Sequence, residues 1–122
     1  MANILFVDDE PLTRKLLTQA AQILGHRGLT ASTAEEALKL ANKELPDLIV
    51  TDINLNGRRS LEMIAQLRDT PETSQIPVIT LSALDLGEIR AEARASGAVA
   101  SLEKPVRLQT LLEVIREYTR KN

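Results

Sequence analysis

The chain has 122 residues, of which 43% are hydrophobic, and its 15 basic and 17 acidic side chains leave a formal net charge of −2. This length suits a single domain with a sizeable core, and the near balance of charge gives no electrostatic case for nucleic acid or an anionic membrane as a partner. Cysteine is absent, which excludes disulfides and thiol catalysis, and no apolar run approaches the roughly 18–20 residues of a membrane span, so we expect a cytoplasmic protein.

The first part of the chain alternates strand-like and helical patterns. Residues 3–7 form an apolar run typical of a buried strand, and residues 28–31 form a weaker one. Between them, Pro11 suits the first turn of a helix, where its missing N–H costs nothing, and Gly25 ends that helix. The apolar positions of this helix recur at helical spacing and are Leu12, Leu16, Leu17, Ala20, Ile23 and Leu24.

The middle of the chain repeats this order. Ser32 or Thr33 caps a second helix as part of a capping box, because a glutamate follows three positions on. The predicted inner stripe of this helix consists of Ala37, Leu38, Ala41 and Leu45. Residues 48–51 are predicted as the third strand and residues 54–57 (Asn-Leu-Asn-Gly) as a loop. The third helix then carries Leu61, Ile64, Ala65 and Leu67.

The last part of the chain supplies two more strands and two more helices. Pro77 opens a fourth strand that continues to residue 81, and the fifth strand covers residues 98–102. The fourth helix is predicted from about Leu86 to Ser96, and the last over residues 107–120, with an inner stripe of Leu108, Leu111, Leu112 and Ile115. Strands that alternate with helices in this way predict an α/β fold over residues 1–122, a doubly wound (βα)5 domain with helices on both faces of a five-stranded parallel sheet.

Polar residues follow four of the predicted strands, each within two residues of the strand's end. These residues are Asp8 and Asp9 after the first strand, Asp52 after the third, Ser82 after the fourth and Lys104 after the fifth. Because open α/β sheets gather ligand sites at the carboxyl ends of their strands, we expect three carboxylates, one hydroxyl and one ammonium in one crevice. This set suits a divalent cation and a phosphoryl group, since a hard cation takes oxygen ligands and relieves the repulsion among carboxylates.

Together these residues resemble the receiver domain of two-component response regulators, in its chemotaxis-regulator-like form, along the whole chain. The markers, in the order and at the strand ends typical of that family, are Val7-Asp8-Asp9, Asp52, Ser82-Ala83 and Lys104-Pro105. The resemblance implies a flavodoxin-like fold with strand order 2-1-3-4-5. It also implies a cis peptide bond between Lys104 and Pro105, which proline makes accessible.

The resemblance further implies what the chain does. Asp52 is expected to be the phospho-acceptor, with Ser82 and Lys104 contacting the phosphoryl oxygens. The expected phosphodonor is a histidine kinase or a histidine phosphotransfer protein, and the expected reader of the signal is a downstream protein target or an output domain. The domain is expected to bind neither nucleic acid nor membrane, and to direct its chemistry at itself without acting as an enzyme on other substrates.

A magnesium site belongs to the same expectation. Mg²⁺ is expected to be held by Asp9, Asp52 and the backbone carbonyl of Asn54, with Asp8 acting mostly through water. In the family, the residues that correspond to Asn54 and Leu84 flank the path of the water that removes the phosphoryl group.

Three places depart from the family's pattern, and one of them is Arg59-Ser60, where the family usually has Asp-Gly. Asn56 stands where the family usually has proline, in the segment after the acceptor strand. Ser101, three positions before Lys104, stands where the family usually has a Tyr or Phe whose ring rotates on activation. Because a serine has no ring to bury, we expect phosphorylation at Asp52 to be retained and the movement of the fourth helix to be small.

Two other functions fit part of the pattern. A receiver-like scaffold that works by protein contact, with little phosphate turnover, is favoured by Ser101 and Arg59 and opposed by the intact set of Asp9, Asp52, Ser82 and Lys104. A magnesium-dependent phosphatase with an aspartyl intermediate needs an acid–base carboxylate two residues after its nucleophile, where this chain has Asn54.

Overall fold

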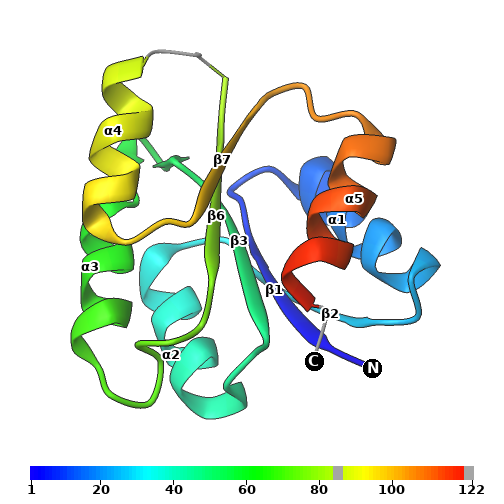
Figure 1. Cartoon of the computed structure of the whole chain (residues 1–122), viewed down its shortest axis with the longest axis horizontal. Helices are drawn as coiled ribbons and strands as arrows, with labels where there is room; N and C mark the ends of the chain where they lie inside the picture. Colours follow the sequence, from blue (N-terminus) through cyan, green and yellow to red (C-terminus); the bar gives the residue numbers. More distant parts are fainter. Residues whose placement is uncertain (84–86, 120–122) are drawn as a thin grey trace.

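The computed structural model describes residues 1–83 and 87–119, and at its centre lies a five-stranded parallel sheet. The strands lie in the order β2-β1-β3-β6-β7, which confirms the predicted order 2-1-3-4-5. They are β1 (Asn3–Val7), β2 (Arg27–Ala31), β3 (Leu48–Asp52), β6 (Val78–Ser82) and β7 (Ala100–Glu103). Because all pairings are parallel, the carboxyl ends of the strands lie at one edge of the sheet, at the top of Figure 1.

Helices cover both faces of this sheet (Figure 1). One face carries α1 (Pro11–Ile23) and α5 (Leu108–Thr119), and the other carries α2 (Ala34–Glu44), α3 (Leu61–Asp69) and α4 (Gly87–Ser96). Within the described residues, no helix has the length and apolar character that crossing a bilayer requires.

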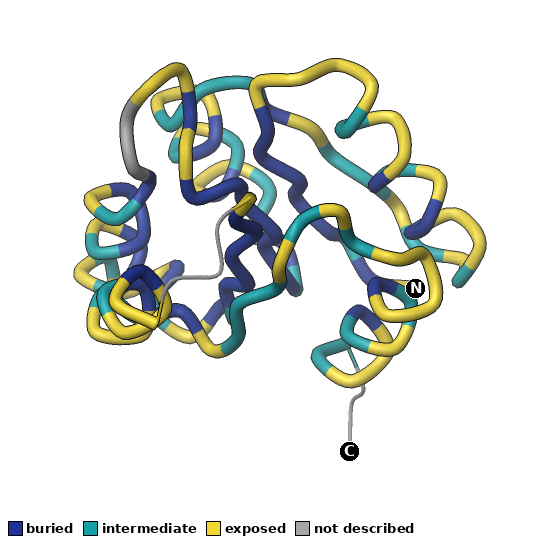
Figure 2. Tube along the Cα trace, turned by 90° about the horizontal axis from the view of Figure 1, so that it is seen from above, coloured by how far each residue is buried: buried dark blue, intermediate teal, exposed yellow. Residues whose placement is uncertain are grey.

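The core is divided in two by the sheet, because successive residues of a strand point to opposite faces. In β1, Ile4 and Phe6 pack in the cluster that contains residues of α1 and α5, whereas Leu5 and Val7 pack with residues of α2 and α3. Strands β3 and β6 are buried along their whole length, and Figure 2 shows the strands as the buried centre of the molecule. Burial on both faces explains why these strands are continuous apolar runs in the sequence.

The predicted helix signals are confirmed at α1 and α2. Pro11 is the first residue of α1, and Gly25 follows its end with a left-handed backbone (φ +79°). Thr33 caps α2, because its hydroxyl oxygen accepts a hydrogen bond from the Glu36 N–H at 3.1 Å. The Glu36 carboxylate in turn accepts the N–H of Ser32 at 2.8 Å, which completes the capping box.

Several apolar positions that recur at helical spacing face solvent. Helix α1 packs on the sheet through a narrow stripe of Leu17, Ala20 and Ala21, while Leu12 is 74% and Leu16 47% exposed. Two residues predicted on inner stripes, Leu45 and Leu108, are also exposed, so that part of the prediction was wrong. Both lie at helix ends, Leu45 as the cap after α2 and Leu108 as the first residue of α5.

The segment after β3 is more ordered than the predicted loop. It forms a short antiparallel hairpin of β4 (Asn54–Leu55) and β5 (Arg58–Arg59). Asn56 and Gly57 form its turn and both have positive φ, at +52° and +81°. A two-residue turn of this kind matches the twist of its two strands, and Asn-Gly is its preferred sequence.

Other boundaries differ by a few residues. The strand predicted over residues 98–102 begins at Ala100, although the N–H of Val99 already donates to the carbonyl of Val78 at 2.8 Å. Helix α4 is described from Gly87, so the predicted start at Leu86 lies outside the described residues. Helix α5 is described to Thr119.

Candidate functional site

Three aspartates meet where β1 and β3 end. Asp8 and Asp9 follow β1, Asp52 is the last residue of β3, and one carboxylate oxygen from each lies within 4.8 Å of the others. They meet because β1 and β3 are neighbouring parallel strands, with Val7 paired to Thr51. Asp8 is fully buried and Asp52 is 8% exposed, whereas Asp9 faces solvent. The structure therefore brings together the three carboxylates that the sequence predicted at one site.

Lys104 supplies the counter-charge to this cluster. Its Nζ donates to Asp8 Oδ2 and to Asp52 Oδ2, at 2.9 Å in both cases. The backbone reaches this position directly after β7, where the Lys104 N–H donates to the Ser82 carbonyl at 2.7 Å. The Lys104–Pro105 bond is cis, as predicted.

The electrostatic balance at Lys104 has two opposing parts. Burial disfavours the charged ammonium, while the hydrogen bonds and charges of Asp52 and Asp8 favour it. The carboxylates outweigh burial, so the pKa of Lys104 lies above its ordinary value of 10.5. The lysine is therefore a fixed positive charge at neutral pH, positioned beside Asp52.

Backbone N–H groups hold the second oxygen of the buried carboxylates and one oxygen of the exposed one. The Glu10 N–H donates to Asp8 Oδ1 at 2.9 Å, and the Asn54 N–H donates to Asp52 Oδ1 at 3.1 Å. Asp9 Oδ2 accepts the N–H of Asn56 at 3.0 Å. Within the described residues, each carboxylate thus has one backbone donor, which limits its rotation and offsets part of the like-charge repulsion.

Two further residues support the site and were missed from the sequence. Arg14, on α1, donates through Nη1 to the carbonyl of Asp8 at 2.7 Å, and so fixes the turn between β1 and α1. Ser60 is buried and donates through Oγ to the carbonyl of Asp52 at 2.9 Å. No local pattern signals either contact, since each side chain bonds to a backbone carbonyl and any donor of suitable reach would serve.

The remaining predicted site residues lie at the same edge of the sheet. Ser82 is the last residue of β6 and is buried, and β6 pairs with β3 so that Asp52 lies opposite Leu81. Asn54 begins the hairpin two residues after Asp52 and is exposed. Leu84, expected to flank the path of attacking water, lies outside the described residues.

The Ser101 side chain faces the neighbouring strand. Its Oγ shares a hydrogen bond of 2.7 Å with Oγ1 of Thr80, a residue that is buried in β6. A cavity of about 10 Å³ separates Ser101 from Ser82, with Ile89 and Arg90 of α4 in its wall. A space of this size holds at most one water molecule.

The chain belongs to the response regulator receiver domain family, which matches residues 4–116. It is 36% identical over 115 residues to the protein PilH of Pseudomonas aeruginosa, covering 94% of this chain and 95% of that protein. It is 31% identical over 116 residues to the polar-differentiation response regulator DivK of Brucella ovis, covering 95% of this chain and 94% of that protein.

A solved structure agrees with this assignment. The chemotaxis response regulator CheY4 of Vibrio cholerae superposes with a TM-score of 0.90 at 30% identity, covering 97% of this chain and 98% of that one. Receiver domains are signalling modules of two-component systems that accept a phosphoryl group at an acidic pocket, and the cluster of Asp8, Asp9 and Asp52 supplies that pocket here.

Proposed function

We propose that residues 1–122 form one receiver domain that accepts a phosphoryl group on Asp52, from a histidine kinase or a histidine phosphotransfer protein in the cytoplasm. The observation that carries the proposal is the double contact of Lys104, at 2.9 Å from both Asp52 and Asp8. This contact places a positive charge directly beside a carboxylate that is otherwise surrounded by negative charge. Such a charge is what a transferring phosphoryl group needs next to its acceptor.

The residues of the site divide the work of the transfer. An oxygen of Asp52 forms the new bond to phosphorus while the bond from phosphorus to the donor nitrogen breaks, and the electron pair of that bond stays on the nitrogen. Lys104 neutralises charge on one phosphoryl oxygen, and the Ser82 hydroxyl donates a hydrogen bond to another. Ala83, exposed next to Ser82, leaves room for the incoming group.

The acidic cluster fits Mg²⁺ as its cation. Three carboxylates within 4.8 Å offer only oxygen ligands, which Mg²⁺ prefers, and an exposed Asp9 leaves the site open to the water ligands that this ion retains. We propose Asp9, Asp52 and the Asn54 carbonyl as direct ligands, with Asp8 acting through water. Bound there, the ion would neutralise charge on the phosphoryl oxygens as the new bond forms.

The experiment is incubation with Mg²⁺ and a small acyl phosphate or phosphoramidate, followed by intact mass. The wild type should gain the mass of one phosphoryl group, and Asp52→Asn should gain none. Asp69→Asn, which changes an exposed aspartate at the end of α3, is the matched control and should behave as the wild type. A wild type that gains no mass, or Asp52→Asn modified to the same extent, contradicts the proposal.

A receiver-like scaffold without phosphate turnover is less well supported. A scaffold needs no ammonium held between two carboxylates, and burying Asp8 and Asp52 without a chemical role would only cost desolvation. The scaffold reading predicts no mass gain, so the same experiment separates the two functions.

We further propose where the phosphodonor protein binds. A mostly apolar groove of about 360 Å³ lies between α1 and the segment 104–111, with Leu16, Val106 and Leu111 in its wall. Lys104 and Ala83 also line it, so the groove opens onto the acceptor site. A molecule bound in this groove would lie beside Asp52. We therefore propose that the groove binds an apolar helix face of the protein that donates the phosphoryl group. Downstream targets or an output domain would bind elsewhere on the domain.

A further inference from the structure

The first arm of the β4–β5 hairpin touches two of the three carboxylates. Asn54 donates its N–H to Asp52 Oδ1 at 3.1 Å, and Asn56 donates its N–H to Asp9 Oδ2 at 3.0 Å. Leu55, between them, is buried in the core with residues of α2 and α3. This alternation is that of an extended chain, in which residues two apart face the same way. The hairpin therefore has an acidic-site side and a core side.

We propose that Asn56 is a positioning residue of the metal site, whose backbone N–H holds the exposed Asp9 carboxylate within reach of Asp8 and Asp52. This inference rests on the proposed magnesium site and names the group that prepares it. Asn56 touches neither the phosphoryl group nor the cation, and acts through Asp9. The hairpin turn is the means by which Asn56 is brought to Asp9, 47 residues earlier in the chain.

Asp9 needs such a partner because of its surroundings. Asp8 and Asp52 are buried and cannot swing away, whereas Asp9 faces solvent and is repelled by both. Among the described residues, the Asn56 N–H is the group that donates a hydrogen bond to the Asp9 carboxylate. Without this hydrogen bond, the exposed Asp9 side chain would point into solvent and sample more rotamers. Cation binding would then have to order the side chain again, which costs conformational entropy.

The residue type at position 56 fits this role. The turn requires positive φ at both Asn56 (+52°) and Gly57 (+81°), which asparagine and glycine adopt most readily. A proline, usual in the family at this position, has no N–H to donate and has its φ fixed near −65°. The departure from the family's pattern at this residue thus coincides with a backbone donor to Asp9.

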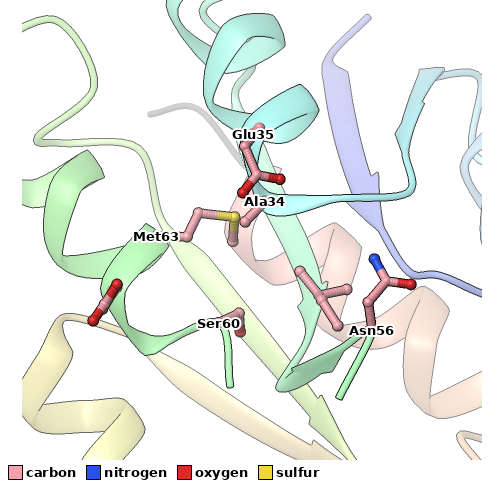
Figure 3. A pocket seen from close by; sticks show the side chains of 7 residues that line it. Ala34, Glu35, Asn56, Ser60 and Met63 are labelled. Carbon is pink, nitrogen blue, oxygen red and sulfur yellow. The ribbon is translucent and has the colours of Figure 1, made fainter. Parts of the chain in front are cut away.

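The tip of the hairpin is located mainly by hydrogen bonds. A pocket of about 260 Å³ lies between the tip, the start of α2 and the side chain of Met63 (Figure 3). In that view Asn56 and Glu35 line different sides of the opening. The Asn56 side chain adds a long contact to the Ser32 carbonyl, at 3.4 Å. Loss of the N–H contact to Asp9 would therefore free the tip as well as the carboxylate.

The first test compares two substitutions of the same residue. Asn56→Pro removes the N–H and the positive φ, whereas Asn56→Gly keeps both and removes only the side chain. Partners of this kind typically change metal affinity 10–100-fold, so at this exposed site we expect Asn56→Pro to bind Mg²⁺ roughly tenfold more weakly. Asn56→Gly should stay within about twofold of the wild type, because only the long contact to Ser32 is lost.

The measurement is a Mg²⁺ titration followed by amide chemical shifts, which needs no phosphodonor. Thermal unfolding of each variant identifies a loss of fold. An Asn56→Pro variant that is folded and binds Mg²⁺ as the wild type does would overturn the inference. Equal weakening in Asn56→Gly would also overturn it, because the side chain and not the backbone donor would then be responsible.

A second measurement uses the wild-type hairpin and so does not depend on the folding of a proline variant. In metal-free protein, the Asn56 amide should exchange with solvent about fivefold more slowly than in Asp9→Ala, the factor expected from one ordinary hydrogen bond. The Gly57 amide serves as the internal reference. Equal exchange at Asn56 in the two proteins rejects the contact. A wild type that fails to bind Mg²⁺ while keeping this difference rejects the proposed metal site instead, so the two failures are distinguishable.

Discussion

At the scale of single residues, Lys104 explains how three carboxylates lie together before a cation arrives. Its ammonium lies between the two buried ones and leaves the exposed Asp9 toward solvent. The charge on Lys104 should therefore be unusually stable in metal-free protein, and this can be measured directly.

We predict that Lys104 loses its proton at a pH above the ordinary lysine value of 10.5. Burial lowers the pKa of Lys104, but the two carboxylates raise it further, so the net direction is upward from 10.5. Its contribution to stability is fully present below the unfolded-state pKa and is lost as the pH rises through the higher folded-state pKa. Carbon-13 titration of the lysine side chains in metal-free protein would measure this.

The control for this titration is Asp52→Asn, which removes one of the two charges and should bring the pKa of Lys104 down. A Lys104 that titrates at or below the ordinary lysine value would contradict the contacts seen at the site.

The sequence located the charged residues of the site but not their supports. Asp52 and Lys104 could be predicted because each directly follows a recognisable strand, and parallel strands bring their ends together. The contacts of Arg14 and Ser60 could not, because both side chains bond to backbone carbonyls and any donor of suitable reach would serve. Asn56 could be predicted only in part. Its residue type indicated a turn, but nothing in the sequence indicated its contact with Asp9.

At the scale of elements, the β4–β5 hairpin is the element that the sequence analysis missed, because it predicted a loop there. Its arms have two residues each, too short for the alternation that identifies a strand, and composition alone then indicates a loop. Asn-Gly was the available signal, because this dipeptide favours a two-residue hairpin turn. In helix α1 the sequence pattern instead predicted too much burial, since the helix has more apolar residues than the sheet covers.

We predict that Leu16, an exposed leucine of α1 that lines the proposed docking groove, serves the phosphodonor protein and not the fold. Leu12 and Leu16 are 74% and 47% exposed, so Leu12→Ser and Leu16→Ser should each change the free energy of unfolding by less than about 0.5 kcal/mol. In Leu16→Ser, phosphotransfer from a purified kinase or phosphotransfer protein that modifies the wild type should slow about tenfold, as when an interface side chain worth over 1 kcal/mol is lost. The rate with a small phosphodonor should not change.

Ile23→Ser is the matched control for these variants. Ile23 is also an exposed apolar residue of α1, at the helix end and outside the groove that Leu16 lines. Its substitution should leave both rates as in the wild type. If Leu16→Ser slows the small donor as much as the protein donor, the leucine supports the site itself and the proposed docking surface is wrong.

At the scale of the whole molecule, the fold was predictable because every level of the sequence agrees. Buried strands, capped helices and short connections all indicate the same doubly covered sheet, and the strand order follows. The response to phosphorylation is different, because it depends on a second arrangement of the same residues. What the structure adds is the packing between Ser82, Thr80 and Ser101, which limits how that response can travel.

We predict that phosphorylation moves α4 only slightly, because Ser101 is already held. Its hydroxyl is bonded to Thr80 at 2.7 Å, and the cavity between Ser101 and Ser82 measures about 10 Å³, far too small for an aromatic ring. A change at Ser82 therefore meets no ring at position 101 that can swing inward, and little apolar area there changes its exposure. Binding of a phosphoryl mimic should shift amide resonances around Asp52, Ser82 and Lys104, and leave residues 88–96 of α4 nearly unchanged.

Two substitutions of Ser101 test the reasoning behind this prediction. Ser101→Ala leaves the buried Thr80 hydroxyl without its partner and should lower the free energy of unfolding by about 1–2 kcal/mol, with the small response of α4 unchanged. Ser101→Tyr introduces a ring that fits only outside the cavity in the resting state, so the same mimic should now shift resonances across α4 and β7. Large shifts throughout α4 in the wild type would mean that the signal reaches this face through the backbone of the segment after Ser82, without any side chain at position 101.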